Sequence, residues 1–330
     1  MDRFADPVDR ALLNDWQRGF PVTFRPFGAL AQQLGTSESD VIARLRAKRA
    51  AGQITRVGAT VAPNTIAAST LAAVAAPEHL VEEVAQIIAA EPGVNHSYLR
   101  EHDWNLWFVV TGPDRAHVAA TLARIGAQSG LRVLDLPLVR PFNLDLGFDL
   151  RGGGVDAAQA VPPPDTGQLR PGDRALLQAL THGLPLQARP YLALATRLGR
   201  DVNDVMARIR ALCAARVISR FGIIVRHRAL GWRSNAMVVW DLPHDAITRA
   251  GPLLAAQPGV TLCYERRPAK GVWPYRLYSM IHARNRAEAL AHIDAAAALP
   301  ALRDVPHLAL FSSRCFKQTG AMVAAERTRA

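Results

Sequence analysis

The chain has 330 residues, of which 49% are hydrophobic and 20% charged, and its formal net charge is +11. These values exclude a disordered or fibrous protein, and the length suffices for two or more units with cores of their own. No apolar run approaches the length of a membrane-spanning helix. The positive charge predicts a polyanionic partner, such as nucleic acid, an anionic lipid surface or a small polycarboxylate.

Cys213, Cys263 and Cys315 are the three cysteines, and their spacing does not pair them as ligands. The sequence therefore predicts neither a disulfide framework nor a metal site, and we interpret the thiols as buried side chains. The first seven residues lack the basic and then apolar profile of a secretory signal, so we expect a cytoplasmic protein.

The sequence repeats itself with an offset of 164 positions. DRALL at 9–13 recurs at 173–177, and VIARLR at 41–46 resembles VMARIR at 205–210. This pattern predicts a tandem duplication, with the Gly-, Ala- and Pro-rich residues 151–170 as the linker. Two fused copies form a pseudo-symmetric pair, so a site between them can be asymmetric.

Each copy is predicted to begin with a winged helix-turn-helix. In the first copy the predicted helices cover residues 10–18, 27–34 and 38–51. The third begins after Thr36 or Ser37 as N-cap and ends at Gly52. Residues 54–58 are predicted to form the wing strand. The second copy repeats this pattern with Asp201 as N-cap. We place the two domains at residues 1–60 and 171–228.

The rest of each copy alternates strand and helix in the order βαββαβ, which is the ferredoxin-like arrangement. The predicted elements of the first copy are residues 70–76, 78–90, 94–100, 106–111, 115–128 and 131–140. Those of the second copy are residues 236–241, 246–256, 260–266, 276–282, 287–298 and 306–312. The predicted fold class is α+β, with ferredoxin-like modules at 61–150 and, including a C-terminal tail, 229–330.

The hairpin of residues 94–110 carries the densest group of chemically active side chains. In a regular strand His96, Tyr98 and Arg100 share one face, and His102 continues that face if the bend permits. A histidine near neutral pH can donate a proton to carbon, so His96 and His102 are candidate catalytic residues. On the residues alone, a pair of solvent-exposed hairpin histidines is the alternative.

The order of winged helix-turn-helix and βαββαβ module resembles the Lrp/AsnC family of regulators. The hairpin motifs are more specific, because they resemble those of the siroheme decarboxylases of the Nir and Ahb type. They are NHSYLREH at 95–102 with NLWF at 105–108, CYERR at 263–267 with WPY at 273–275 and MIH at 280–282, and LFSSRCFKQTG at 310–320. The resemblance covers nearly the whole chain, and the duplicated layout is similar to the fused NirDL form.

The resemblance implies a carboxy-lyase that needs no organic cofactor. Its substrate would be siroheme, whose C12 and C18 acetate carboxyl groups are removed to give 12,18-didecarboxysiroheme for haem d1 or an alternative haem. It also implies that haem can co-purify with the protein. Homologous decarboxylase subunits or a second copy of the chain are the implied partners, with no membrane partner.

A flat iron tetrapyrrole with many carboxylates needs cations around its rim and apolar or aromatic surface against its faces. The candidate rim cations are Arg100, Arg266, Arg267, Arg314 and Lys317. The candidate contacts of the macrocycle are Tyr98, Trp104, Tyr264 and Trp273. The alternative for each cation is a solvated surface residue, and for each aromatic residue it is core filling.

The two hairpins are not equivalent. Leu262 stands in the second copy where His96 stands in the first, although the resemblance implies a histidine there. We therefore expect the chemistry on the first hairpin and mainly binding on the second. His282 is a candidate iron ligand or second acid, with a hydrogen-bonded strand histidine as the alternative. The other histidines, including His227, are interpreted as surface or capping residues.

Two other functions remain open from the sequence: a DNA-binding regulator with a haem or amino-acid effector, and a non-catalytic haem-binding subunit. Arg44, Arg46, Lys48 and Arg49 lie on the candidate recognition helix and could contact phosphates. That helix is rich in alanine and lacks Asn and Gln, so base readout would depend on arginine alone. We interpret both winged domains as scaffolds and do not expect DNA binding.

Overall fold

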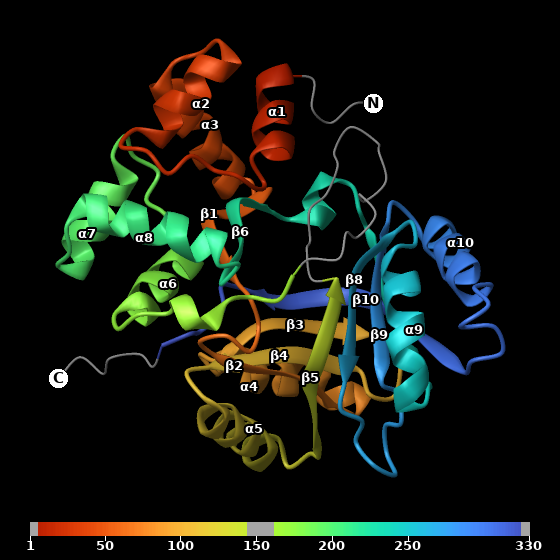
Figure 1. Ribbon diagram of the computed structural model, residues 1–330. Coiled ribbons are helices and arrows are strands. Elements are labelled where there is room, and N and C mark those ends of the chain that lie inside the picture. The colour runs from red at the N-terminus through yellow and green to blue at the C-terminus, as the bar shows by residue number, and fades with distance from the viewer. Residues whose placement is uncertain (1–5, 144–161, 325–330) are drawn as a thin grey trace.

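The computed structural model describes residues 6–143 and 162–324. Residues 151–161 of the predicted linker lie outside the described part, and its remainder contains a short 3-10 helix, Thr166–Gln168. The predicted fold class is confirmed: each copy contains a winged helix-turn-helix followed by a βαββαβ module. Figure 1 shows the two winged domains together on one side of a β-barrel.

The winged domains form as predicted, within a few residues at each boundary. Their elements are α1 (Pro7–Asp15), α2 (Pro26–Leu34), α3 (Glu38–Ala50) and β1 (Ile54–Val61), then α6 (Asp173–His182), α7 (Pro190–Leu198), α8 (Val202–Ala214) and β6 (Ile218–Val225). The Ser37 side chain caps α3 by accepting a hydrogen bond from the Asp40 amide at 3.1 Å. Gly35 and Gly199 end α2 and α7 at φ values of 66° and 63°, which glycine adopts without steric cost.

The two wing strands pair with each other. β1 and β6 form a two-stranded antiparallel sheet in which Gly58 faces Gly222, its equivalent in the repeat. A Cβ on Gly58 would lie 2.4 Å from the Leu180 carbonyl oxygen, and one on Gly222 would lie 2.3 Å from that of Gln17. The sequence predicts each wing but not this pairing, which joins the two winged domains around one hydrophobic core.

The two ferredoxin-like modules close into one eight-stranded barrel, with the strand order β10-β3-β4-β2-β5-β8-β9-β7. The first copy supplies β2 (Ala68–Val74), β3 (Val94–Arg100), β4 (Leu106–Gly112) and β5 (Val133–Asn143). The second copy supplies β7 (Ser234–Trp240), β8 (Val260–Arg266), β9 (Leu277–Ala283) and β10 (His307–Gln318). Closure pairs every strand on both sides, so none of the eight is left as an open edge.

Two long strands make the junctions between the copies. β5 pairs with β2 of its own copy and then with β8, and β10 pairs with β7 of its own copy and then with β3. The predicted strands end at residues 140 and 312, so they are too short. The missing residues 141–143 and 313–318 belong to the stretches that cross to the other copy.

Helices cover the outside of the barrel. They are α4 (Val81–Ala90) and α5 (Arg115–Ser129) over the first sheet, and α9 (His244–Ala255) and α10 (Arg286–Ala297) over the second (Figure 1). A separate cluster with Trp107, Tyr264, Trp273 and Tyr278 fills the space between the sheets. Across the described residues, each helix is too short or too polar to span a bilayer.

Candidate functional site

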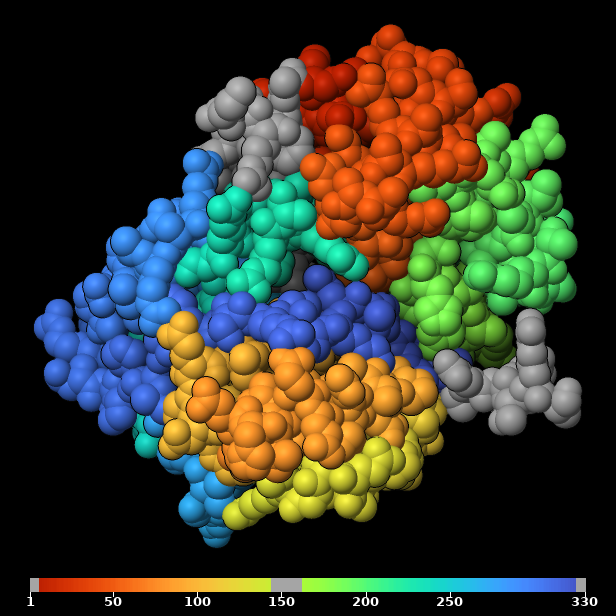
Figure 2. All heavy atoms as spheres, turned by 180° about the vertical axis from the view of Figure 1, so that it is seen from behind, coloured from red at the N-terminus to blue at the C-terminus, as the bar shows by residue number. Residues whose placement is uncertain are grey.

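A cavity of about 340 Å³ lies between the winged domains and the barrel. Its lining includes Tyr98 of β3, the triplet Arg226, His227 and Arg228 that follows β6, and Cys315 of β10. Figure 2 shows a hollow between the teal segment after β6, the orange segment around the end of α3 and the blue strand β10. We call this the first cavity, because it opens beside the first hairpin.

Strand β3 presents three of the predicted residues toward this side of the barrel. The rings of His96 and Tyr98 stack with centroids 6.5 Å apart, and the Arg100 guanidinium lies 5.6 Å from the centre of the Tyr98 ring. Alternate residues of a strand share a face, so the predicted grouping of these three is observed. The His96 ring nitrogen Nδ1 lies 2.9 Å from Oδ1 of Asn95, which holds the ring in place.

His227 joins this group from the second copy. Its ring is buried and meets the ring of His282 edge to face at a centroid distance of 4.4 Å. Burial, with the Arg228 charge second, lowers the pKa of His227 to about 4. Burial, with the Arg56 charge second, lowers the pKa of His96 to about 4. Both imidazoles are therefore neutral at pH 7 in the ligand-free protein.

A buried hydrogen-bond chain fixes Arg100. The guanidinium donates to the Leu310 carbonyl at 2.8 Å and to Oδ1 of Asn235 at 3.4 Å. The amide nitrogen of Asn235 then faces Nε2 of His282 at 2.6 Å, while Nδ1 of His282 lies 2.6 Å from the Thr261 hydroxyl. Since Asn235 donates to Nε2, this nitrogen is an acceptor and His282 is neutral. Both ring nitrogens are engaged, so His282 is not poised to bind iron.

Among the described residues, Arg226 and Arg228 of the first cavity and the nearby Arg100 lack acidic partners. Within residues 6–143 and 162–324, no carboxylate forms an ion pair with Arg100, Arg226 or Arg228. Arg228 donates only to backbone carbonyls, at 3.3 and 3.4 Å, and Nε of Arg100 is buried without a partner. Burial lowers the pKa of Arg100 to about 10, so it stays charged at pH 7. The site is prepared for an anion.

A second cavity is lined in part by the segment after the first wing, where Asn64 and Thr65 are the repeat equivalents of Arg228 and Ala229 in the first cavity. It is larger, about 580 Å³, and its lining includes Asn64, Thr65, Leu138, Arg115 and Arg267. Size does not make it the better candidate. Its lining contains no histidine, and Arg115 is paired with Asp135.

Another carboxylate near the second cavity also pairs with cations. Arg140 donates to Glu265 at 2.7 Å, and His244 contacts the same carboxylate at 2.7 Å. Arg266 is buried, donates to the Leu136 carbonyl at 2.8 Å and lies over the Tyr264 ring at 4.6 Å. The second hairpin thus has the aromatic residue and arginine of the first but adds carboxylates.

His102 is not brought to His96. It lies in the turn after β3, where its Nδ1 accepts from the Trp104 amide at 3.0 Å and its ring meets Trp273 at 5.5 Å. The strand from His96 to Arg100 alone spans about 13 Å at ~3.3 Å per residue. The expectation that the two histidines converge on one surface is wrong, because the bend continues the strand away from the first cavity. Trp104 and Trp273 pack with the cluster between the sheets.

Arg314 and Lys317 lie against α4 and not in the cavity. Arg314 is exposed, pairs with Glu82 and covers the Phe316 ring at 4.6 Å. Nζ of Lys317 donates to the carbonyls of Ala89 and Glu91 at 2.7 and 2.9 Å, which satisfies the C-terminal end of the helix. Both side chains have structural partners that the strand pattern does not reveal.

His227 is the main residue that sequence reasoning missed. Its interpretation as a surface or capping residue is wrong, since it is buried at the first cavity. A signal was present in the repeat, where the triplet 226–228 is Arg-His-Arg but the equivalent residues 62–64 are Ala-Pro-Asn. A charged triplet found in only one copy, directly after the wing, is the sequence signal that could have indicated the first cavity.

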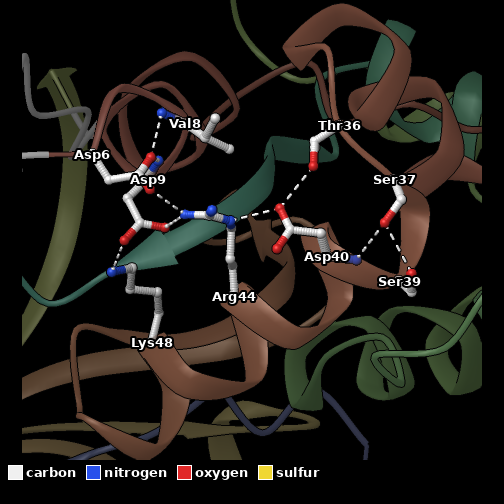
Figure 3. Close-up of polar contacts among 9 residues, drawn as sticks. All are labelled: Asp6, Val8, Asp9, Thr36, Ser37, Ser39, Asp40, Arg44 and Lys48. Atoms are coloured by element: carbon white, nitrogen blue, oxygen red, sulfur yellow. Dashed lines mark hydrogen bonds and ion pairs between the residues drawn. The ribbon is translucent and has the colours of Figure 1, made fainter.

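Several cations of the recognition helices have partners within the protein, although Arg49 is exposed. Figure 3 shows Arg44 of α3 between three carboxylates, Asp6 at 2.8 Å, Asp9 at 3.0 Å and Asp40 at 2.7 Å, with Lys48 also paired to Asp9. In the second copy Arg208 of α8 forms a buried bidentate pair with Asp173, the equivalent of Asp9, with both distances 2.7 Å.

Two further arginines of these helices connect the winged domains. Arg46 donates to the Leu186 carbonyl at 2.7 Å, and its equivalent Arg210 donates to the carbonyl of Val22, the equivalent of Leu186. The recognition helices are therefore tied to the neighbouring winged domain. This arrangement supports the interpretation of these domains as scaffolds.

Comparison with known proteins gives matches in both copies. A sequence model described as the AsnC-like ligand binding domain matches residues 66–143 and 229–317. A second model, described as the siroheme decarboxylase NirDL-like HTH domain, matches residues 9–54 and 173–218. These matches coincide with the barrel modules and with the helices of the winged domains.

Relatives match over the same regions. A siroheme decarboxylase NirDL subunit of Paracoccus denitrificans is 55% identical over 320 residues, which cover 97% of this chain and 98% of that protein. A siroheme decarboxylase NirD subunit of Stutzerimonas stutzeri is 48% identical over 145 residues, 44% of this chain and 95% of that subunit.

A solved structure matches the whole fold. It is the siroheme decarboxylase NirDL in complex with an iron-uroporphyrin III analogue, with a TM-score of 0.65 and 25% identity, covering 95% of this chain and 92% of that one. Together with the near full-length relative, this match settles the family. The chain belongs to the siroheme decarboxylase family and has the two-copy organisation of its NirDL subunits.

Proposed function

We propose that this protein is a siroheme decarboxylase that removes the C12 and C18 acetate carboxyl groups in the first cavity. The family match supports the reaction, and the observation that supports the place is the group of neutral histidines among arginines without acidic partners. Siroheme is larger than a typical drug-sized ligand, and the first cavity, about 340 Å³, is at the small end of the ~300–1,000 Å³ usual for such ligands, so it would receive one edge of the macrocycle.

The arginines have the role of holding and orienting the carboxylate rim. Arg100, Arg226 and Arg228 offer forked donors that bind carboxylates bidentately. Tyr98 lines the same cavity and presents its ring between His96 and Arg100. Arg266 and Arg267 of the second hairpin remain predicted binding residues. We propose that they contribute less to substrate affinity than the arginines at the first cavity.

The histidines have the role of proton donors. Loss of carbon dioxide breaks the bond between the carboxylate carbon and the acetate methylene, and the electron pair stays on the methylene. A proton must then reach that carbon to leave a methyl group. Bound carboxylates offset the arginine charges that help to keep His96 and His227 neutral, which raises their pKa values and favours the donor form. No organic cofactor is part of this proposal.

Assembly and location also belong to the proposal. Relatives occur as separate NirD, NirL and NirH subunits, so we propose homologous subunits or a second copy of the chain as partners. The engaged recognition helices disfavour a DNA-binding regulator. A cytoplasmic location stays a prediction.

The experiment is anaerobic incubation of the purified protein with siroheme, followed by mass spectrometry of the extracted tetrapyrrole. We expect loss of two carboxyl groups. Unchanged siroheme, with homologous partner subunits also present, would contradict the proposal. Bound but unchanged siroheme would instead support the non-catalytic haem-binding alternative.

A further inference from the structure

We propose that Arg56 of the first wing binds a carboxylate of the tetrapyrrole, so that a winged domain forms part of the substrate site. This inference rests on the proposed function and adds a residue from outside the barrel. Arg56 lies in β1, two positions before Gly58, where the two wings meet. It therefore stands next to the junction between the copies.

The arginine is held in a defined place. A Cβ on Gly183 would lie 2.8 Å from Cβ of Arg56, and Gly183 has a φ of 110°, so only glycine fits this close passage without strain. The Leu184 amide donates to the Val57 carbonyl at 2.7 Å, which keeps the chain after α6 against β1. The stem of Arg56 is thus packed between its own strand and the end of α6.

A series of contacts connects the end of α6 with His96. The Thr181 hydroxyl at the end of α6 donates to the Ala321 carbonyl at 3.0 Å, and the Thr319 amide donates to the Asn95 carbonyl at 2.7 Å. In the β10–β3 register Gln318 is paired with His96. The tail after β10 therefore connects the end of α6, where Arg56 lies, with the start of β3. The effect of the Arg56 charge on the pKa of His96 agrees with this proximity.

Most hydrogen-bond donors of the Arg56 guanidinium have no partner among the described residues. Its one guanidinium hydrogen bond among the described residues goes from Nη2 to the Ala59 carbonyl at 3.2 Å, and Nε is buried without a partner. No carboxylate of the described chain pairs with it. Burial, with the charge of its repeat equivalent Arg220 second, lowers its pKa to about 10. A partly buried cation without an acidic partner is costly, and a substrate carboxylate would offset that cost.

The test is Arg56→Gln, with Arg25→Gln as the matched control. Arg25 belongs to the same winged domain but is exposed and paired with Glu38. Binding is followed by anaerobic absorbance titration with siroheme and with iron-uroporphyrin, and turnover is measured separately. We expect Arg56→Gln to raise Kd and KM by about 10- to 100-fold with kcat changed far less, because one charge-assisted contact is lost. Arg25→Gln should leave both values unchanged.

Thermal unfolding of the ligand-free variants separates binding from structure. Removal of an unpaired buried charge should leave the Tm of Arg56→Gln equal to or above that of the wild type. A lowered Tm with unchanged Kd and KM would overturn the inference and make Arg56 a structural residue. Unchanged values throughout would also overturn it. Failure of the wild type to decarboxylate siroheme would contradict the proposed function, whereas the Kd comparison would still decide the role of Arg56.

Discussion

The two cavities are each lined by the segment that follows a wing, with residues 64–65 in one and 226–229 in the other, yet they differ in charge and in chemistry. The first is lined by the triplet 226–228 and by Tyr98, whose ring stacks on His96, and its Arg228 donates to backbone carbonyls. The lining of the second contains Asn64 of the triplet 62–64 and no histidine, and its Arg115 is paired with Asp135. Under the proposed function, a few side chains decide which part of this duplicated chain binds a polyanion and delivers a proton.

The largest effect is expected from the histidines of the first cavity. His96→Gln or His227→Gln should lower kcat by about 10²- to 10⁴-fold, the usual contribution of a positioned proton donor, with little change in Kd. Leu262→Ala is the matched change at the equivalent second-copy position and should leave kcat within a few-fold. Anaerobic turnover assayed by mass spectrometry gives the comparison. An equal loss in Leu262→Ala would remove the distinction between the two halves.

A smaller effect, on substrate affinity, is expected from Arg100 and Arg266, the equivalent arginines of the two hairpins. Arg100→Met should weaken siroheme binding by about 10- to 100-fold, and Arg266→Met by less. The pair is well matched, because each arginine donates to a backbone carbonyl of the other copy at 2.8 Å and lies over a tyrosine ring. Equal losses of affinity would show that both hairpins bind substrate to the same degree.

Stability should depend on pH through the buried histidines. The folded-state pKa values of His96 and His227 are about 4, below the unfolded value of ~6.5, so the unfolded chain binds more protons between these values. The Tm of the ligand-free protein should therefore fall as the pH is lowered from about 6.5 toward 4. His227→Gln should flatten this dependence, and an unaltered profile would argue against its neutral burial.

Much of the fold could be predicted from the sequence, because helix caps, strand alternation and the repeat are local signals. The closure of the barrel could not. The stretches that join the copies lie at the ends of β5 and β10. They lack a clear apolar alternation, because they contain charged residues such as Arg140, Arg314 and Lys317. They are strands because another strand pairs with them, and such a long-range partner leaves no local pattern.

The site could be predicted only where local strand alternation carries it. His96, Tyr98 and Arg100 were grouped correctly because a single strand carries them. His102 was misplaced because the direction of a chain after a bend does not follow from alternation. No local pattern reveals His227 or Arg56, because only the tertiary arrangement brings the segment after the second wing to the barrel and places the two wings against each other.

The most direct test of the asymmetric site is a crystal structure of the protein with siroheme bound under anaerobic conditions. We expect the tetrapyrrole in the first cavity, with one acetate beside His96 and His227 and with rim carboxylates on Arg100, Arg226 or Arg228. Siroheme bound instead in the second cavity, against Asn64 and Arg267, would contradict the account.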